Sequence, residues 1–300
     1  MSVLFALIRR NVKLFFKDKA MFFTSMVTPL ILLLLYVTFL GEVYKDSFVA
    51  TLSGMGLSVE DALADGFVAG QLFSSLLAVC SITVAFCSNM LMVQDKANGT
   101  RCDLTVSPVP TRTLSLAYYL ATVISTAIVC FVSIGVCLIY IAAVGWYLSF
   151  TDVLLIFLDT TLLILFGTAL SSVIHHFLST QGQISAVGTV VSAGYGFICG
   201  AYMPISQFSE GLQRVLSVLP GTYGTSLLRQ HALGGVCREM EAQGYPSAAI
   251  TGLRDAFDCN IYVGEHLVAP YAMYLVIALC TLILLTVFVL LSRRSKRRRK

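Results

Sequence analysis

Asp159 is the acidic residue best placed for chemistry in an apolar environment, because it lies well inside a long apolar segment. A carboxylate in such a segment is costly unless it faces a partner or a water-filled path, and it often marks a functional site. Asp159 also lies about two turns from one end of its predicted helix, where water can reach it. Two interpretations follow. The carboxylate is either a charge on a pathway or in a pair, or a hydrated group near a membrane surface.

The other reactive residue types do not form a catalytic or metal-binding motif. The sequence contains no G-x-x-x-x-G-K-[ST] phosphate loop, no H-E-x-x-H zinc motif, no G-x-S-x-G nucleophile motif and no C-x-x-C pair. His175 and His176 are adjacent, so on a helix they point about 100° apart and are expected to anchor its end rather than share a metal ion. The sequence therefore predicts a protein that is not an enzyme, with no catalytic residue, metal site or bound cofactor of its own.

Two cysteines stand apart from the apolar stretches that hold most of the others. Cys237 and Cys259 lie in a polar segment, residues 234–269, that is expected outside the membrane. An oxidising compartment would allow them to form a disulfide. Because sequence does not place the two sulfurs side by side, a disulfide and two free thiols both remain open.

Six long apolar segments must position these residues. They are residues 22–40, 67–93, 114–144, 153–174, 183–200 and 271–291. A helix needs about 20 mostly apolar residues to cross a bilayer. Hydrophobic residues make up 57% of the chain and charged residues 12%. The sequence therefore predicts an all-α integral membrane protein with six transmembrane helices.

The basic residues predict which side each end faces. Most lie before the first segment, between the second and third, and after the last: Arg9, Arg10, Lys13, Lys17, Lys19, Lys96, Arg101, Arg112, Arg293, Arg294, Lys296, Arg297, Arg298, Arg299 and Lys300. Six crossings put these three segments on one side, and basic segments are retained in the cytoplasm. We expect a multi-pass protein of the cell (plasma or inner) membrane with both termini cytoplasmic. The basic tail, residues 292–300, is expected to touch anionic lipid rather than nucleic acid.

Residues 1–20 have the pattern of a helix that lies in the membrane interface. The apolar residues that share one helical face are Leu4, Phe5, Ile8, Val12, Phe15 and Phe16, and the basic residues Arg9, Arg10, Lys13 and Lys17 share the adjoining face. A basic amphipathic helix of this kind binds to the inner membrane surface.

The segment after the fifth apolar stretch predicts an outer helical hairpin. Residues 205–219 and 223–233 have short helical patterns, and Pro220 separates them. Fifteen helical residues rise only about 22 Å, which is too short to cross a bilayer. Residues 201–233 are therefore expected to form a re-entrant hairpin, followed by an extracytoplasmic loop over residues 234–269.

The connection over residues 94–113 is similar to a family pattern. Residues 94–109 read QDKANGTRCDLTVSPV, which resembles the acidic–basic–x–x–G-T-x-E-x-L-x-x-[ST]-P-[VLI] pattern of permease subunits of type-2 ATP-binding-cassette (ABC) exporters. The matching residues are Asp95, Lys96, Gly99, Thr100, Leu104, Ser107, Pro108 and Val109. Cys102 stands where the family commonly has a glutamate, and Asp103 follows it, so the acidic contact is shifted or lost. Pro108 and Pro110 end the segment sharply.

A second segment also resembles that family. Residues 200–204 (GAYMP), 219–223 (LPGTY) and 228–229 (LR) are similar in order and spacing to its G-x-x-x-P, L-P-x-T-Y and later L-R elements. In the family, these residues belong to a re-entrant hairpin that caps the transport path. The resemblance thus implies that Pro204, Pro220 and Tyr223 shape an outer gate.

The resemblance covers essentially the whole chain and implies one permease domain over residues 1–300. Residues 94–113 would dock on a separate ABC ATPase subunit, which would bind ATP and Mg. The residues implied in this coupling are Gly99, Thr100, Asp103, Leu104, Ser107 and Pro108. A second permease chain, identical or not, would complete a dimer in the lipid membrane. The implied function is export of a small amphipathic molecule, a lipid or a peptide.

Two other functions remain open from the residues themselves. An ion-gradient-driven transporter would need inverted repeats and paired charges near the middle of the membrane, and neither is evident. A peptide-sensing or immunity subunit could share the same architecture without transporting anything.

Overall fold

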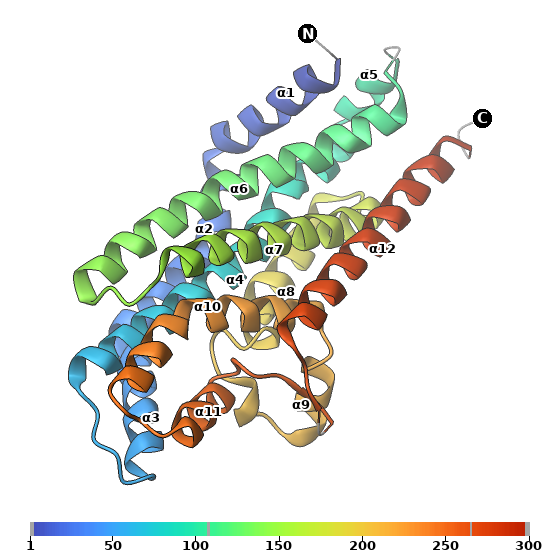
Figure 1. Ribbon diagram of the computed structural model, residues 1–300. Coiled ribbons are helices and arrows are strands. Elements are labelled where there is room, and N and C mark those ends of the chain that lie inside the picture. The colour runs from blue at the N-terminus through green and yellow to red at the C-terminus, as the bar shows by residue number, and fades with distance from the viewer. Residues whose placement is uncertain (1–2, 107–108, 265, 298–300) are drawn as a thin grey trace.

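The computed structural model describes residues 3–106, 109–264 and 266–297 as a bundle of long helices (Figure 1). Its elements are α1 (Val3–Lys17), α2 (Lys19–Leu35), η1 (Tyr36–Leu40), α3 (Gly41–Ser53), α4 (Asp61–Ala97), α5 (Thr100–Val106), α6 (Thr111–Val144), α7 (Phe150–Phe177), α8 (Gln181–Ile198), η2 (Ile205–Gln207), α9 (Glu210–Leu216), α10 (Pro220–Ala242), α11 (Ser247–Ala256), β1 (Tyr262–Val263), β2 (His266–Leu267) and α12 (Pro270–Arg297). The two strands form one short antiparallel pair. The predicted all-α class is confirmed.

Five helical units in the described residues are long and apolar enough to cross a membrane. They are Lys19–Ser53, Asp61–Ala97, Thr111–Val144, Phe150–Phe177 and Pro270–Arg293. The predicted sixth span, α8, is not among them. Its 18 residues begin with two glutamines and include several serine, threonine and glycine residues, which lower its hydropathy. A count of six crossings is therefore not confirmed.

The central helix of the bundle is α4. Nearly all of its apolar stretch is buried, against α2, α6, α7, α8 and α10. A helix that is apolar all round is stable only where protein or lipid surrounds it. Most helices of the bundle therefore pack directly against α4.

The first span is a continuous helix that changes its winding midway. Asp18 begins it, because its carboxylate accepts a hydrogen bond from the Met21 amide at 3.0 Å. Residues Tyr36–Leu40 form a π-helical turn, and the helix then continues as α3 to Ser53. The span therefore extends well past the predicted end at residue 40. A π-helical turn inside an α-helix is rare and often lies at a functional site.

The outer hairpin differs from the prediction. Residues 205–219 contain a short 3-10 turn and the seven-residue helix α9 instead of one helix, and the next helix, α10, continues from Pro220 to Ala242. The glycines at 234 and 235 do not break it. A side chain at Gly235 would overlap the carbonyl oxygen of Tyr147, so this glycine allows a close approach instead. The expected loop over residues 234–269 holds the end of α10, α11 and the strand pair, and a re-entrant hairpin is not confirmed.

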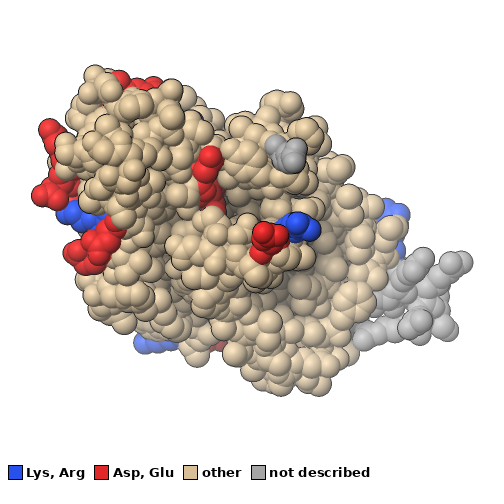
Figure 2. Space-filling view, turned by 90° about the horizontal axis from the view of Figure 1, so that it is seen from below, with Lys and Arg blue, Asp and Glu red and all other residues tan. Residues whose placement is uncertain are grey.

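The two ends of the bundle differ in character. Both chain ends lie at the same end as α5, whereas α3, α9 and α11 lie at the opposite end (Figure 1). The view from below shows a mostly uncharged surface with scattered acidic and basic side chains (Figure 2). We call the end that carries α5 the inner end and the opposite one the outer end.

Candidate functional site

A polar network lies at the inner end, immediately before α5. Arg10 of α1 forms two hydrogen bonds with the carboxylate of Asp95 on α4, at 2.8 and 3.1 Å. The hydroxyl of Tyr118 on α6 donates to the same carboxylate at 2.5 Å. The bond to Asp95 raises the pKa of Arg10 above its ordinary value. Bidentate arginine–carboxylate pairs are among the strongest polar contacts in proteins, so α1, α4 and α6 are joined here.

The next residue, Lys96, joins α4 to α7. Its Nζ donates to the backbone carbonyls of His175, His176 and Leu178 at 3.0, 2.9 and 3.0 Å. These carbonyls lie at the end of α7, where an α-helix leaves carbonyl groups without helical partners, although that of His175 also accepts from the Leu178 amide. A cation there also complements the helix dipole. We call Arg10, Asp95, Lys96 and Tyr118 the inner polar node.

The predicted coupling residues lie three to twelve positions after Lys96. Gly99 has φ of +80°, a left-handed conformation that favours glycine, and turns the chain from α4 into α5. Thr100 begins α5, Asp103 is exposed, and Leu104 packs against apolar side chains of α1, α4 and α6. Ser107 and Pro108 lie outside the described residues. Thus α5 is a seven-residue helix presented at the inner end, beside the node (Figure 1).

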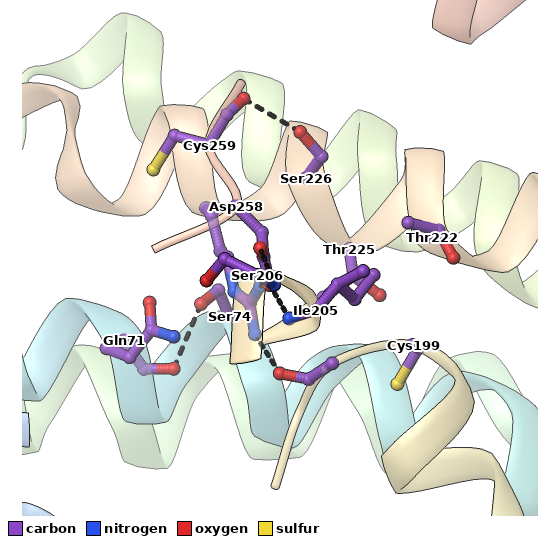
Figure 3. Close-up of polar contacts among 12 residues, drawn as sticks. Gln71, Ser74, Cys199, Ile205, Ser206, Thr222, Thr225, Ser226, Asp258 and Cys259 are labelled. Carbon is purple, nitrogen blue, oxygen red and sulfur yellow. Dashed lines mark hydrogen bonds and ion pairs between the residues drawn. The ribbon is translucent and has the colours of Figure 1, made fainter. Parts of the chain in front are cut away.

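A second polar network lies at the outer side of the bundle and contains a buried ion pair. Arg229 of α10 is 1% exposed, and its Nη1 lies 3.0 Å from Oδ2 of Asp258. Its Nη2 donates to the carbonyl of Gly200, and Asp258 accepts from the amides of Ile205 and Ser206 at 2.6 and 3.3 Å. Figure 3 shows Asp258, Ile205 and Ser206 between α4 and α10. We call this network the outer clasp, because it joins three segments that are distant in sequence: residues 200–206, α10 and the residues after α11.

Burial and the charge of Arg229 shift the pKa of Asp258 in opposite directions. Burial raises the pKa of this carboxyl, and Arg229 opposes the rise by stabilising the charged form. Arg229 was predicted only as part of the LR motif, and Asp258 was not predicted as a site residue. No local pattern marks that aspartate, although its φ of +54° is unusual for a residue other than glycine.

The three predicted outer-gate residues do not form one surface. Pro204 precedes the 3-10 turn and borders the large groove described below. Pro220 is the first residue of α10, where a missing amide hydrogen is harmless. Tyr223 is buried one turn further on. Only Pro204 is among the residues that line the groove.

Cys237 and Cys259 are both buried free thiols. Burial raises the pKa of Cys259 to about 12 and also raises that of Cys237. The carbonyl of Cys259 accepts hydrogen bonds from Ser226 and Gln230 at 2.8 and 2.6 Å. This position is therefore tied to α10 without a disulfide, and the disulfide stays a prediction.

Asp159 is fully buried and paired, which argues against a hydrated carboxylate. Its Oδ2 lies 2.6 Å from Nδ1 of His231 on α10, and its Oδ1 accepts from the hydroxyl of Tyr274 on α12 at 2.6 Å. Asp159 is not among the residues that line the groove. The carboxylate thus joins three helices on another side of the bundle.

A large groove runs along the bundle between the first span and α8. Its volume is about 1150 Å³, and α4 contributes Cys87, Met90 and Gln94 to its lining. From Asp18 and Gln181 it extends to Tyr44, Gln207 and Phe257. The lining within the described residues contains Asp18 but no lysine or arginine. Ligand cavities typically have volumes of about 300–1000 Å³, so the groove is large enough for a drug-sized or lipid-like molecule.

These features define a membrane-embedded transport subunit: several spanning helices, a long groove, and an exposed helix joined to the inner ends of the spans. A model of the ABC-2 type transporter family matches residues 2–233. The chain belongs to this family, and the predicted permease of a type-2 ABC transporter is confirmed. No curated protein matches the chain. The match ends within α10, so α11 and α12 lie beyond it.

Proposed function

We propose that this chain is the permease subunit of an ATP-driven exporter and receives energy from a separate ABC ATPase subunit. The observation that carries the proposal is the position of α5, exposed at the inner end and next to a node that joins four spans or interfacial helices. ATP and Mg would be bound by the ATPase. The cargo would be a small amphipathic molecule, a lipid or a peptide that leaves the cytoplasm.

The inner polar node would carry motion from α5 into the bundle. When ATP closes the ATPase subunits, α5 moves, and Asp95 and Lys96 move with it. Asp95 is bonded to α1 and α6, while Lys96 is bonded to the end of α7, which leads directly into α8. Because α8 forms one wall of the groove, a rigid-body shift there would change the groove between two states.

A second permease chain would cover the open side of the groove. The groove-facing and exposed residues of α8 include Gln181, Ser185 and Thr189. Polar side chains are unfavourable against lipid, whereas small and hydroxyl-bearing residues favour contact between helices. The transport path would then lie between two permease chains, identical or different.

The proposed orientation places the inner end in the cytoplasm of the cell membrane. The basic residues of α1 and of the segment around α5 lie at this end, together with both chain ends. Retention of basic segments in the cytoplasm supports this orientation.

One observation favours an ion-gradient-driven alternative. The buried pair of Asp159 and His231 lies among α7, α10 and α12, where a titratable pair could bind a proton. Its separation from the groove favours the ATP-driven proposal, because a coupling group would be expected beside the cargo. A peptide-sensing subunit would show ATPase binding without transport.

The test is co-purification of the ATPase with the tagged full-length chain from native membranes in mild detergent. Asp103→Arg reverses the charge at an exposed position of α5, and Asp46→Arg makes the same change at an exposed position of α3, at the outer end. We expect wild type and Asp46→Arg to retain a stoichiometric ATPase and Asp103→Arg to lose it by about tenfold, as charge reversal in an interface predicts. Recovery of the wild-type chain alone, under conditions that preserve a known ATPase–permease complex, would overturn the proposal.

A further inference from the structure

Four buried polar side chains lie between the first span and α4 without a hydrogen bond of normal geometry to any described residue. They are Tyr36, Tyr44, Gln71 and Ser75, each between 0% and 4% exposed. Within the described residues, neither phenol hydroxyl, neither amide atom of Gln71 nor the Ser75 hydroxyl makes a hydrogen bond of normal geometry. We call these four residues the unpaired cluster.

The four side chains are neighbours. The rings of Tyr36 and Tyr44 stack with their centroids 5.4 Å apart. Tyr36 interacts with Ser75, and Tyr44 interacts with Gln71, but neither contact has the geometry of a normal hydrogen bond. Tyr36 is the first residue of the π-helical turn, Tyr36–Leu40, and Tyr44 lies in the first turn of α3 after it.

The outer clasp borders this cluster. Arg229 interacts electrostatically with both tyrosines, and its Nε also lacks a partner although its other nitrogens are bonded. Figure 3 shows Gln71 on α4 facing the residues of the clasp. Since Asp258 balances the charge of Arg229, the surroundings of the cluster carry no net charge.

A buried polar group without a partner lowers stability, and an apolar residue of the same shape would avoid this cost. Nearly all such groups in native proteins bind another protein group, water or a ligand. Several together in a low-dielectric interior are therefore a strong indication that the site accepts something that can donate and accept hydrogen bonds.

The groove leads to the unpaired cluster. Tyr44 belongs to both, and its ring lies beside Phe257, another groove residue, with centroids 5.9 Å apart. Leu35, which precedes the π-helical turn, and Leu40, its last residue, also line the groove. The groove wall is largely apolar and lacks basic residues in the part of the chain described, so it does not favour an anion.

We propose that Tyr36, Tyr44, Gln71 and Ser75 form a subsite for the polar head of an uncharged amphipathic substrate whose apolar part occupies the groove. This assignment rests on the permease function proposed above and names its substrate class. Hydroxyl or amide groups on the head would pair with the phenols, the Gln71 amide and the Ser75 hydroxyl. Movement of the Tyr44 ring away from Phe257 would admit the head from the groove.

The test measures equilibrium binding to the full-length chain, with every subunit that co-purifies, in lipid nanodiscs. The probes share one alkyl tail and differ in head charge: dodecylglycerol, dodecyl phosphate and dodecyltrimethylammonium. We expect saturable binding of dodecylglycerol, and binding of the two charged probes weaker by about tenfold or more, because a buried charge here lacks a counter-ion. Comparable binding of dodecyl phosphate would overturn the charge assignment.

The variants Tyr44→Phe and Gln71→Leu locate the binding site. Each should weaken dodecylglycerol binding by about tenfold, the effect of one lost hydrogen bond, while leaving the melting temperature unchanged or raised. Thr126→Val is the matched control, because it removes another fully buried and unpaired hydroxyl, on α6 and outside the groove lining. Its probe binding should equal that of the wild type.

Binding that is the same in wild type, Tyr44→Phe and Gln71→Leu would overturn the subsite and leave the cluster as a site for ordered water alone. A co-purifying ATPase without dodecylglycerol binding would also overturn it, while the permease proposal stands. Dodecylglycerol binding with the expected variant pattern, but without an ATPase, would support the subsite and refute the permease proposal.

Discussion

Asp159 on α7 and His231 on α10 lie 2.6 Å apart, oxygen to nitrogen, in the interior of the bundle. Seven residues away on each helix, Asp152 pairs with Arg238. Seven residues are about two helical turns, so the two pairs recur on one face of each helix as the helices run antiparallel. These pairs hold α10 against α7 and explain why a helix with four strongly polar residues packs inside the bundle.

Removing the Asp159 carboxylate should destabilise the chain strongly. Asp159→Ala leaves His231 and Tyr274 without their partner in a buried place, and breaking a buried pair typically costs about 3–5 kcal/mol. The free energy of unfolding, measured by titration with a denaturing detergent, should fall by about that amount.

The control for this prediction is Asp61→Ala. Asp61 is also paired, with Lys45, but its side chain is 93% exposed. An exposed pair contributes only about 0–1 kcal/mol. Equal losses in the two variants would contradict the structural role assigned to Asp159.

Local sequence patterns predicted the long apolar helices but not α10. Pro220 and the polar character of residues 234–269 predicted instead a hairpin over residues 201–233 and an outer loop after it. In the structure, α10 carries Arg229, His231 and Arg238. Each of these side chains is paired in the structure with an acid at least 29 positions away: Asp258, Asp159 and Asp152. Such pairs depend on tertiary packing, which no local periodicity encodes.

The candidate site was predicted unevenly for the same reason. The predicted coupling residues lie close together in sequence, so a single motif contains them. The node that joins them to the bundle was missed, because Arg10 and Asp95 are 85 positions apart. The unpaired cluster has no motif at all, since its four residues lie on two helices.

Gly235→Ala should test the close contact between α10 and the segment before α7. The added carbon would overlap the carbonyl oxygen of Tyr147, which is backbone and does not move easily. We expect a loss of about 2–3 kcal/mol, which is typical of overpacking in a core. Thermal unfolding in detergent measures it.

Gly135→Ala is the matched control. Gly135 lies within α6, and nothing lies within 4 Å of an added carbon there. Alanine in a helix interior is better than glycine by about 0.5–1 kcal/mol, so this variant should keep or gain stability. If the two variants lost a similar amount of stability, the loss in Gly235→Ala would not come from overlap with Tyr147. The packing at Gly235 would then be looser than the structure indicates.

The outer clasp should make stability depend on pH. Burial raises the pKa of Asp258 above its unfolded value of 3.8, so between these two values the folded chain binds more protons than the unfolded chain. Stability contributed by this group is therefore present at low pH and decreases as the pH rises through this window. The difference in unfolding free energy between wild type and Asp258→Asn should shrink in the same direction.

In Asp258→Asn, Arg229 loses its counter-charge, so this variant should be less stable than the wild type throughout. The diagnostic quantity for the outer clasp is the slope, against pH, of the difference in unfolding free energy between the wild type and Asp258→Asn. A difference curve that is flat from pH 4 to pH 7, or that rises with pH, would show that Arg229 outweighs burial and lowers the pKa of Asp258 instead.

Gly99→Ala should weaken the connection between α4 and α5 without a steric clash. Gly99 has φ of +80° and open space around it, so the cost comes from backbone conformation alone, about 1–2 kcal/mol for a residue with a side chain. We expect a normally folded chain in which α5 is displaced and ATPase co-purification falls. Gly182→Ala, at an equally open position at the start of α8, should retain the ATPase.

Lys96 offers a way to separate ATPase binding from transmission. Lys96→Met keeps an unbranched side chain that is one atom shorter and removes the three hydrogen bonds to the end of α7. Since α5 itself is unchanged, the ATPase should still co-purify. The stimulation of its ATP hydrolysis by dodecylglycerol should fall by about tenfold, as expected when one charged contact of about 1.5–3 kcal/mol is lost.

The control is Lys45→Met. It removes a lysine that is paired at the outer end and should leave the stimulation intact. If Lys96→Met loses the ATPase altogether, Lys96 holds the docking surface rather than transmitting its movement, whereas unchanged stimulation would assign transmission to Asp95 and its partners on α1 and α6.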